Sequence, residues 1–182
     1  HKRGIAVIID VVFNHATGLH PYAKMWWNSS SNCTASNNPF FNVSAPHNFS
    51  VYHDFKHTYQ GTVNFFDDVL KFWLEEYNVD GFRFDLTKGF VQNPGSYDAG
   101  GYSAERIGIL KHYAETIRSV EEDAYIIFEH FCDQKEETEL YESVGDAKAE
   151  EYRKDYLFFK KLKDSDSLRF NDSVDFSKYE DG

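Results

Sequence analysis

The sequence is poor in cysteine, in positive charge and in long apolar runs. Its two cysteines, Cys33 and Cys132, cannot make a disulfide framework, and only the fold could bring them close enough to pair. Nineteen Lys and Arg against 30 Asp and Glu give a net charge of −11, which argues against nucleic acid or an anionic membrane as partner. No apolar run approaches the roughly 20 residues of a membrane-spanning helix.

The chain also lacks an initial methionine and any visible signal peptide. It opens at His1 and enters an apolar segment within a few residues, so we expect a segment of a longer protein. Its 182 residues, 41% of them hydrophobic and 18% aromatic, suffice for a folded domain with a core. The high content of aromatic residues favours a core packed with aromatic rings, and the alternative is that some of these rings bind sugars.

Short apolar runs alternate with segments of helical period. Strands are predicted over 5–12, 81–85 and 125–128, and helices over 62–77, 103–120 and 135–163. Ser103 is a plausible N-cap, and Asn78 suits a left-handed helix end. This order predicts right-handed βαβ units, which occur both in open doubly wound sheets and in barrels.

Two segments show no sustained period. Residues 17–60 are rich in Asn, Ser, Pro and aromatics, which favours a functional insertion over a disordered loop. Residues 164–182 are acidic and irregular. We therefore predict one domain over 1–182, with an inserted subdomain over 17–60.

Polar residues gather where each predicted strand ends. The carboxyl-end region of the first strand carries Asp10, Asn14 and His15, that of the second Arg83, Asp85 and Lys88, and that of the third Glu129. In a (β/α)8 barrel such strand ends converge on one rim, which carries the active site. This placement favours part of a barrel over an open sheet.

Asp85 and Glu129 are the candidate catalytic pair. Arg83 lies two residues before Asp85 on the same side of the strand, where it would keep that carboxylate ionised. Glu129 follows a fully apolar strand, and apolar surroundings suit a proton donor. Two carboxylates in contrasted surroundings fit glycoside hydrolysis, and a short separation would make the reaction retaining. Taken singly, a strand-end Asp is more often a helix cap or a structural ion-pair partner.

Three ordered motifs carry a resemblance to a known family. DVVFNH at 10–15, GFRFDLTKG at 81–89 and FEHFCD at 128–133 are similar to the first three conserved regions of the α-amylase superfamily, glycoside hydrolase family thirteen. The resemblance implies an α/β fold, a partial (β/α)8 TIM barrel with strands three to five and a protruding insertion after strand three. It also implies a starch-degrading enzyme that is secreted, periplasmic or on the cell surface of a bacterium.

The resemblance assigns roles by position. It implies a retaining hydrolase of starch or maltooligosaccharides, in which the nucleophile and acid/base are Asp85 and Glu129. Substrate contacts would come from His15, Arg83 and Lys88, structural support from Asp10, and ligands for a structural Ca2+ from Asn14 and Asp54.

The sequence departs from the family at two places. Gly89 stands where many α-amylases have a histidine that contacts the sugar. The family's fourth region, a His-Asp pair, has no counterpart after Asp133. We therefore expect this chain alone to be inactive and to need the rest of the barrel. A transglycosylase with the same residues, or a non-catalytic fragment that only binds oligosaccharide, are the alternatives.

Overall fold

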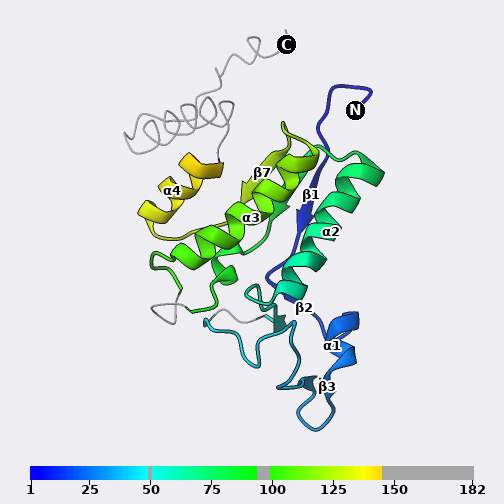
Figure 1. Cartoon of the computed structure of the whole chain (residues 1–182), viewed down its shortest axis with the longest axis vertical. Coiled ribbons are helices and arrows are strands. Elements are labelled where there is room, and N and C mark those ends of the chain that lie inside the picture. Colours follow the sequence, from blue (N-terminus) through cyan, green and yellow to red (C-terminus); the bar gives the residue numbers. More distant parts are fainter. Residues whose placement is uncertain (49–50, 94–98, 145–182) are drawn as a thin grey trace, which may run out of the picture. The chain divides into compact units, whose positions relative to one another are not determined.

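Three parallel strands form the centre of the computed structural model, which describes residues 1–48, 51–93 and 99–144. They are β1 (Ile8–Val11), β6 (Gly81–Phe84) and β7 (Tyr125–Phe128), in the order β1-β6-β7 (Figure 1). Asp10 pairs in register with Arg83, and Arg83 with Ile127. A Cβ at Gly81 would collide with the backbone of the neighbouring strand, so the close pairing of β6 with β7 requires glycine there.

Two long helices connect these strands. Helix α2 (Gln60–Tyr77) leads from β1 to β6, and α3 (Ala104–Val120) leads from β6 to β7. Both predicted helix ends are confirmed, because Asn78 adopts the left-handed conformation and the Ser103 hydroxyl accepts the N–H of Arg106. Helix α4 (Gln134–Val144) begins as predicted, and the rest of the helix predicted to 163 lies outside the described residues.

The core lies between α2, α3 and one face of the sheet. Phe82 and Phe84 of β6 are fully buried there, together with Leu70 of α2 and Leu110 of α3. The opposite face has no such cover among the described residues. Every second residue of a strand points to the same face, and on this face Ile8 and Asp10 of β1 and Tyr125 and Ile127 of β7 are exposed. Helices on one face only are typical of a barrel wall, whereas a doubly wound sheet is covered on both faces.

The segment after β1 contains more regular structure than the sequence indicates. It holds helix α1 (Pro21–Met25) and two short antiparallel pairs, β2 (His15–Ala16) with β5 (His53–Asp54) and β3 (Trp27–Asn28) with β4 (Cys33–Thr34). Its aromatic rings stack on one another, with centroids 4.1 Å apart for Tyr22 and Phe40 and 4.4 Å for Phe41 and Phe55. These rings pack the segment's own interior, as the core interpretation of the aromatic content predicts.

A short helical turn follows β6. Residues Thr87–Phe90 form a 3-10 helix, η1, whose Thr87, Gly89 and Phe90 are buried. Leu86 precedes it in the left-handed conformation, with φ of 49°. The turn therefore packs into the domain at the end of the strand that carries Asp85.

Candidate active site

Arg83 joins the strand-end carboxylates. Its Nη1 donates to Asp10 Oδ1 at 2.8 Å and to Asp85 Oδ1 at 2.9 Å, and its Nη2 lies 3.0 Å from Glu129 Oε1. Hydrogen bonds from the guanidinium, first to Asp10 and then to Asp85, raise the pKa of Arg83 above its ordinary value. A guanidinium offers donors in a fixed planar fork, so one side chain can orient three carboxylates at once.

The sheet ladder explains why these carboxylates meet. The N–H of Asp85 continues the β1–β6 pairing by donating to Val11 O at 2.9 Å, and the N–H of Glu129 donates to Phe84 O at 3.0 Å. Arg83 and Ile127 pair with each other on the uncovered sheet face. Asp85 lies two residues after Arg83, and Glu129 lies two residues after Ile127. Both carboxylates therefore project from the same rim and the same face.

The expectation of apolar surroundings for Glu129 is wrong. Besides its ion pair with Arg83, Glu129 accepts the Leu86 N–H through Oε2 at 3.0 Å, and 29% of its side chain is exposed. The polar neighbours come from the adjacent strand and the turn after it, which the run 125–128 does not reveal. Asp85, with 32% of its side chain exposed, shares the same guanidinium.

Asn14 and His15 follow β1 within a few residues, and His15 begins β2. The Asn14 Nδ2 is 3.2 Å from His15 Nδ1, and burial lowers the pKa of His15, partly offset by the charges of Asp85 and Asp54. Asn14 Oδ1 is buried without a hydrogen-bond partner. A Cβ at Gly89 would collide with that Asn14 amide, so the glycine leaves room for it.

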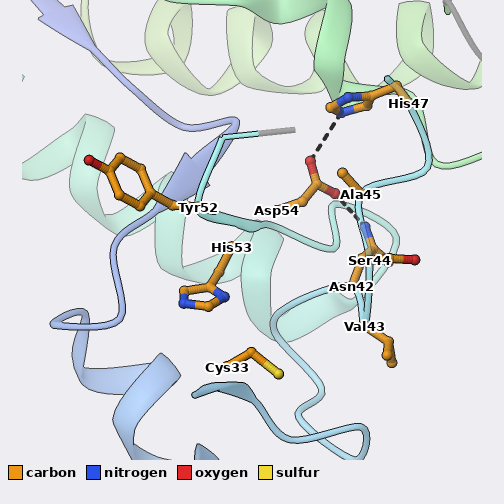
Figure 2. Close-up of a pocket in the computed structure, with 9 residues that line it drawn as sticks. All are labelled: Cys33, Asn42, Val43, Ser44, Ala45, His47, Tyr52, His53 and Asp54. Carbon is orange, nitrogen blue, oxygen red and sulfur yellow. Dashed lines mark hydrogen bonds and ion pairs between the residues drawn. The ribbon is translucent and has the colours of Figure 1, made fainter. Parts of the chain in front are cut away.

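Asp54 lies beside a cavity of about 250 Å³ in the segment after β1 (Figure 2). Its Oδ1 is 3.2 Å from the Nε2 of His47, and its Oδ2 accepts the Nδ2 of Asn42 at 2.7 Å. Burial raises the pKa of Asp54, although these hydrogen bonds oppose it. Asp54 pairs with His15 across β2 and β5, so the segment after β1 is anchored close to the residues that follow that strand.

Lys88 and the cysteines make less specific contributions. Lys88 lies in η1, and its carbonyl accepts Arg106 Nη1 at 2.9 Å. Cys33 and Cys132 are both free thiols, and burial raises the pKa of Cys132 to about 11. Cys132 therefore carries no reactive thiolate at neutral pH.

A buried ion pair behind the rim was not predicted. Arg106 of α3 and Glu136 of α4 are fully buried and joined by two hydrogen bonds, of 2.6 Å and 2.7 Å. His130 lies 3.0 Å from the same carboxylate, and ligand atoms of His130, Cys132 and Glu136 lie within 4.8 Å of one another. The guanidinium already occupies both oxygens of Glu136, which makes this group an ion-pair cluster in preference to a metal site.

The parallel sheet has helices on one face only, and its carboxylates are linked at the carboxyl ends of the strands. Both features are typical of part of a (β/α) barrel. Solved structures support that fold. Amy13B of Eubacterium rectale superimposes with a TM-score of 0.60 at 25% identity, over 79% of this chain and 31% of that one. An α-amylase of Geobacillus thermoleovorans gives a TM-score of 0.56 at 19% identity, over 80% and 30% of the two chains.

Curated relatives are similar to part of this sequence. Isoamylase SU1 of Zea mays is 40% identical over 91 residues, and pullulanase of Bacillus subtilis is 35% identical over 91. Each match covers 47% of this chain and 11% of the relative, so the chain spans about a tenth of their length. No family model matches the chain. The comparisons therefore support the resemblance to the α-amylase superfamily, and the relatives named here come from a plant chloroplast and from bacteria.

Proposed function

We propose that the full-length protein is a retaining α-glucan hydrolase whose nucleophile is Asp85 and whose acid/base is Glu129. The observation that carries this proposal is the single guanidinium of Arg83, within 3.0 Å of both carboxylates. Retaining glycosidases have their two carboxyl groups closer together than inverting ones, and sharing one guanidinium suits the shorter separation.

In this mechanism Asp85 attacks the anomeric carbon and forms a covalent glycosyl-enzyme, while Glu129 protonates the departing oxygen. Glu129 then removes a proton from water, which hydrolyses the intermediate. Arg83 orients both groups, and Asp10 holds Arg83 from the neighbouring strand. His15 of β2 and Lys88 of η1 contact the substrate. A sugar hydroxyl in place of that water would give transglycosylation.

The three parallel strands correspond in this proposal to strands three to five of an eight-stranded barrel. Residues 17–60 form the protruding subdomain after the third strand. The uncovered sheet face, with Ile127 and Tyr125 more than 40% exposed, suits contact with further barrel strands. The third carboxylate of the family site would come from those strands, and this chain alone would be inactive.

The names of the curated relatives, isoamylase and pullulanase, suggest branched α-glucans as the substrate class. Starch, pullulan and maltoheptaose offered to the same preparation distinguish branch-point cleavage from cleavage within linear chains. Secretion, or a periplasmic or cell-surface location, belongs to the same proposal, and cell fractionation with activity assays tests it. None of the described helices is long and apolar enough to cross a membrane.

A structural Ca2+ fits the expected ligands only in part. The buried Asn14 Oδ1 lacks a partner and suits a hard cation, whereas both oxygens of Asp54 are engaged by His47 and Asn42. With one of two expected ligands already engaged, these residues do not form a calcium site, and the mechanism uses none. A rise in Tm on adding Ca2+ that Asn14→Ala abolishes would overturn this conclusion.

Substitution of the two carboxylates tests the proposal. Asp85→Asn and Glu129→Gln should each reduce kcat of the full-length protein at least 1,000-fold, on the order of the loss of a catalytic carboxylate. Asp68→Asn, an exposed aspartate on α2, is the matched control and should retain full activity. Maltosyl fluoride, whose fluoride departs without help from an acid, should form a covalent glycosyl-enzyme on Asp85 in Glu129→Gln. Peptide mass spectrometry detects the labelled peptide. Full activity of Asp85→Asn would refute the assignment.

A further inference from the structure

Tyr52 combines an exposed side chain with an unusual backbone conformation. Its φ is 54°, in the left-handed region, and 67% of the residue is exposed. Bulky residues other than glycine rarely adopt this conformation, and those that do collect at functional sites, where the surroundings enforce it. Because so much of the residue is exposed, packing of the core does not explain why a tyrosine stands at this strained position.

The ring of Tyr52 differs from the other aromatic rings of the segment after β1. Phe41 and Phe55 are buried in the interior of that segment. The ring of Tyr52 lies instead beside the ring of His15, with centroids 6.1 Å apart and planes inclined by 36°. Figure 2 shows the Tyr52 side chain pointing away from the Asp54 carboxylate. The interpretation that the aromatic residues fill a core therefore does not cover Tyr52, and the alternative of sugar binding stays open for it.

Strand pairing fixes where this ring lies. Tyr52 directly precedes β5, which pairs with β2 through Asp54 and His15. Asn42 also binds β5, because its N–H donates to the Asp54 carbonyl at 2.9 Å and its Nδ2 donates to the Asp54 carboxylate at 2.7 Å. A binding group on a strand held in this way is ordered before its ligand arrives, which lowers the entropic cost of binding.

His15 connects the position of this ring to the catalytic rim. Burial lowers the pKa of His15, and the charge of Asp85 is the first of the effects that oppose this shift. The two side chains are therefore close enough to interact electrostatically. The ring of Tyr52 thus lies next to the histidine that faces the proposed nucleophile, at the carboxyl-end rim of the sheet.

We propose that Tyr52 is a substrate-binding residue whose ring receives the apolar face of a glucose unit next to the unit that His15 contacts. This inference rests on the proposed function and adds a contact to the same site. A pyranose ring has a face of C–H groups, and covering an exposed aromatic ring with such a face removes apolar surface of both partners from water. The phenol hydroxyl at the edge of the ring leaves a polar group toward the sugar hydroxyls.

Binding of an uncleaved ligand tests this contact without any catalysis. The probe is a maltopentaose in which sulfur replaces the glycosidic oxygens, so that it resists hydrolysis, and calorimetric titration of the full-length protein gives its Kd. Tyr52→Asn removes the ring but suits the left-handed backbone, because Asn adopts that conformation more readily than other non-glycine residues. We expect Kd to rise about tenfold through the loss of one apolar contact surface, with Tm not lowered.

Two further variants separate the ring from other effects. Tyr52→Phe keeps the aromatic face and should bind as the wild type does. Tyr77→Asn is the matched control, because Tyr77 is also exposed but lies at the end of α2, next to the start of β6 and away from the carboxyl-end rim. Its Kd should equal that of the wild type.

The outcomes distinguish this inference from the proposed function. An unchanged Kd in Tyr52→Asn, an equal rise of Kd in Tyr77→Asn, or a Tm that falls together with the affinity of Tyr52→Asn would overturn the role of Tyr52, even in a protein that hydrolyses starch. A wild type that binds the probe through Tyr52 but hydrolyses no α-glucan would overturn the proposed function alone. A wild type that does not bind the probe would overturn both.

Discussion

His57 makes the stability of the protein depend on pH. Its ring is buried between Phe90, on which it stacks with centroids 4.2 Å apart, and Phe66. Nε2 lies 3.0 Å from the Phe13 carbonyl, which can only accept, so Nε2 carries the proton and Nδ1 accepts the hydroxyl of Tyr113 at 2.9 Å. Both nitrogens are satisfied in the neutral form. Burial lowers the pKa of His57 to about 3, although the Phe13 carbonyl opposes the shift.

The size of the effect follows from linkage. Because the pKa of His57 is lower in the folded than in the unfolded state, its contribution is complete above pH 6.5 and decreases as the pH falls toward 3. At pH 5 the folded ring is still neutral, while the unfolded ring is 1.5 pH units below its ordinary pKa. The loss at pH 5 is therefore about 2 kcal/mol, at about 1.4 kcal/mol per pH unit.

The assay is urea unfolding of the full-length protein and of His57→Gln at pH 7.5 and pH 5. Glutamine can keep both hydrogen bonds but does not titrate. We expect the stability difference between wild type and variant to shift by about 2 kcal/mol in favour of the variant at pH 5. A difference that is the same at both pH values would show that His57 is not held neutral, and would refute the reasoning.

Three further changes test the site and its support. Arg83→Lys replaces two guanidinium nitrogens, which together contact three carboxylates, by one ammonium group. We therefore expect kcat to fall on the order of 100-fold. An unchanged kcat in steady-state assays would contradict this. Gly89→Ala places a methyl group against the Asn14 amide, so Tm should fall by several degrees in calorimetry, and an unchanged Tm would contradict this close packing. Glu136, with its pKa lowered to about 2, stabilises the fold above its ordinary value of 4.5, so a wild-type advantage over Glu136→Gln should be lost as the pH falls from 4.5 toward 2.

The sequence predicted the sheet and the ends of the two long helices well, because those features depend on local signals. The apolar run at 5–12 and the alternation of apolar and polar residues at 81–85 are typical of strands buried in a sheet. Ser103 caps the start of α3 and Asn78 the end of α2, each within one turn of its own helix. The rim was predictable for a similar reason, since strand ends in parallel sheets converge.

The surroundings of Glu129 and the Arg106 cluster could not be predicted, because both depend on side chains brought together from distant positions. Arg106 and Glu136 lie 30 residues apart on two charged helices, where each resembles a solvated surface residue. Likewise, the apolar run before Glu129 indicates only how the residues of that strand are buried. It carries no information on Arg83, which reaches Glu129 from the neighbouring strand.

The saturation of Arg106 has a consequence for the evolution of this segment. Its five N–H groups meet acceptors from η1, from the backbone at 99 and 101, and from α4, so no other side chain has the number and geometry of donors to replace it. Loss of Arg106 alone would leave Glu136 as an unpaired buried charge, and loss of Glu136 alone would do the same to Arg106. The two positions should therefore vary among homologous sequences only in concert, as an epistatic pair, while the exposed residues around them drift independently.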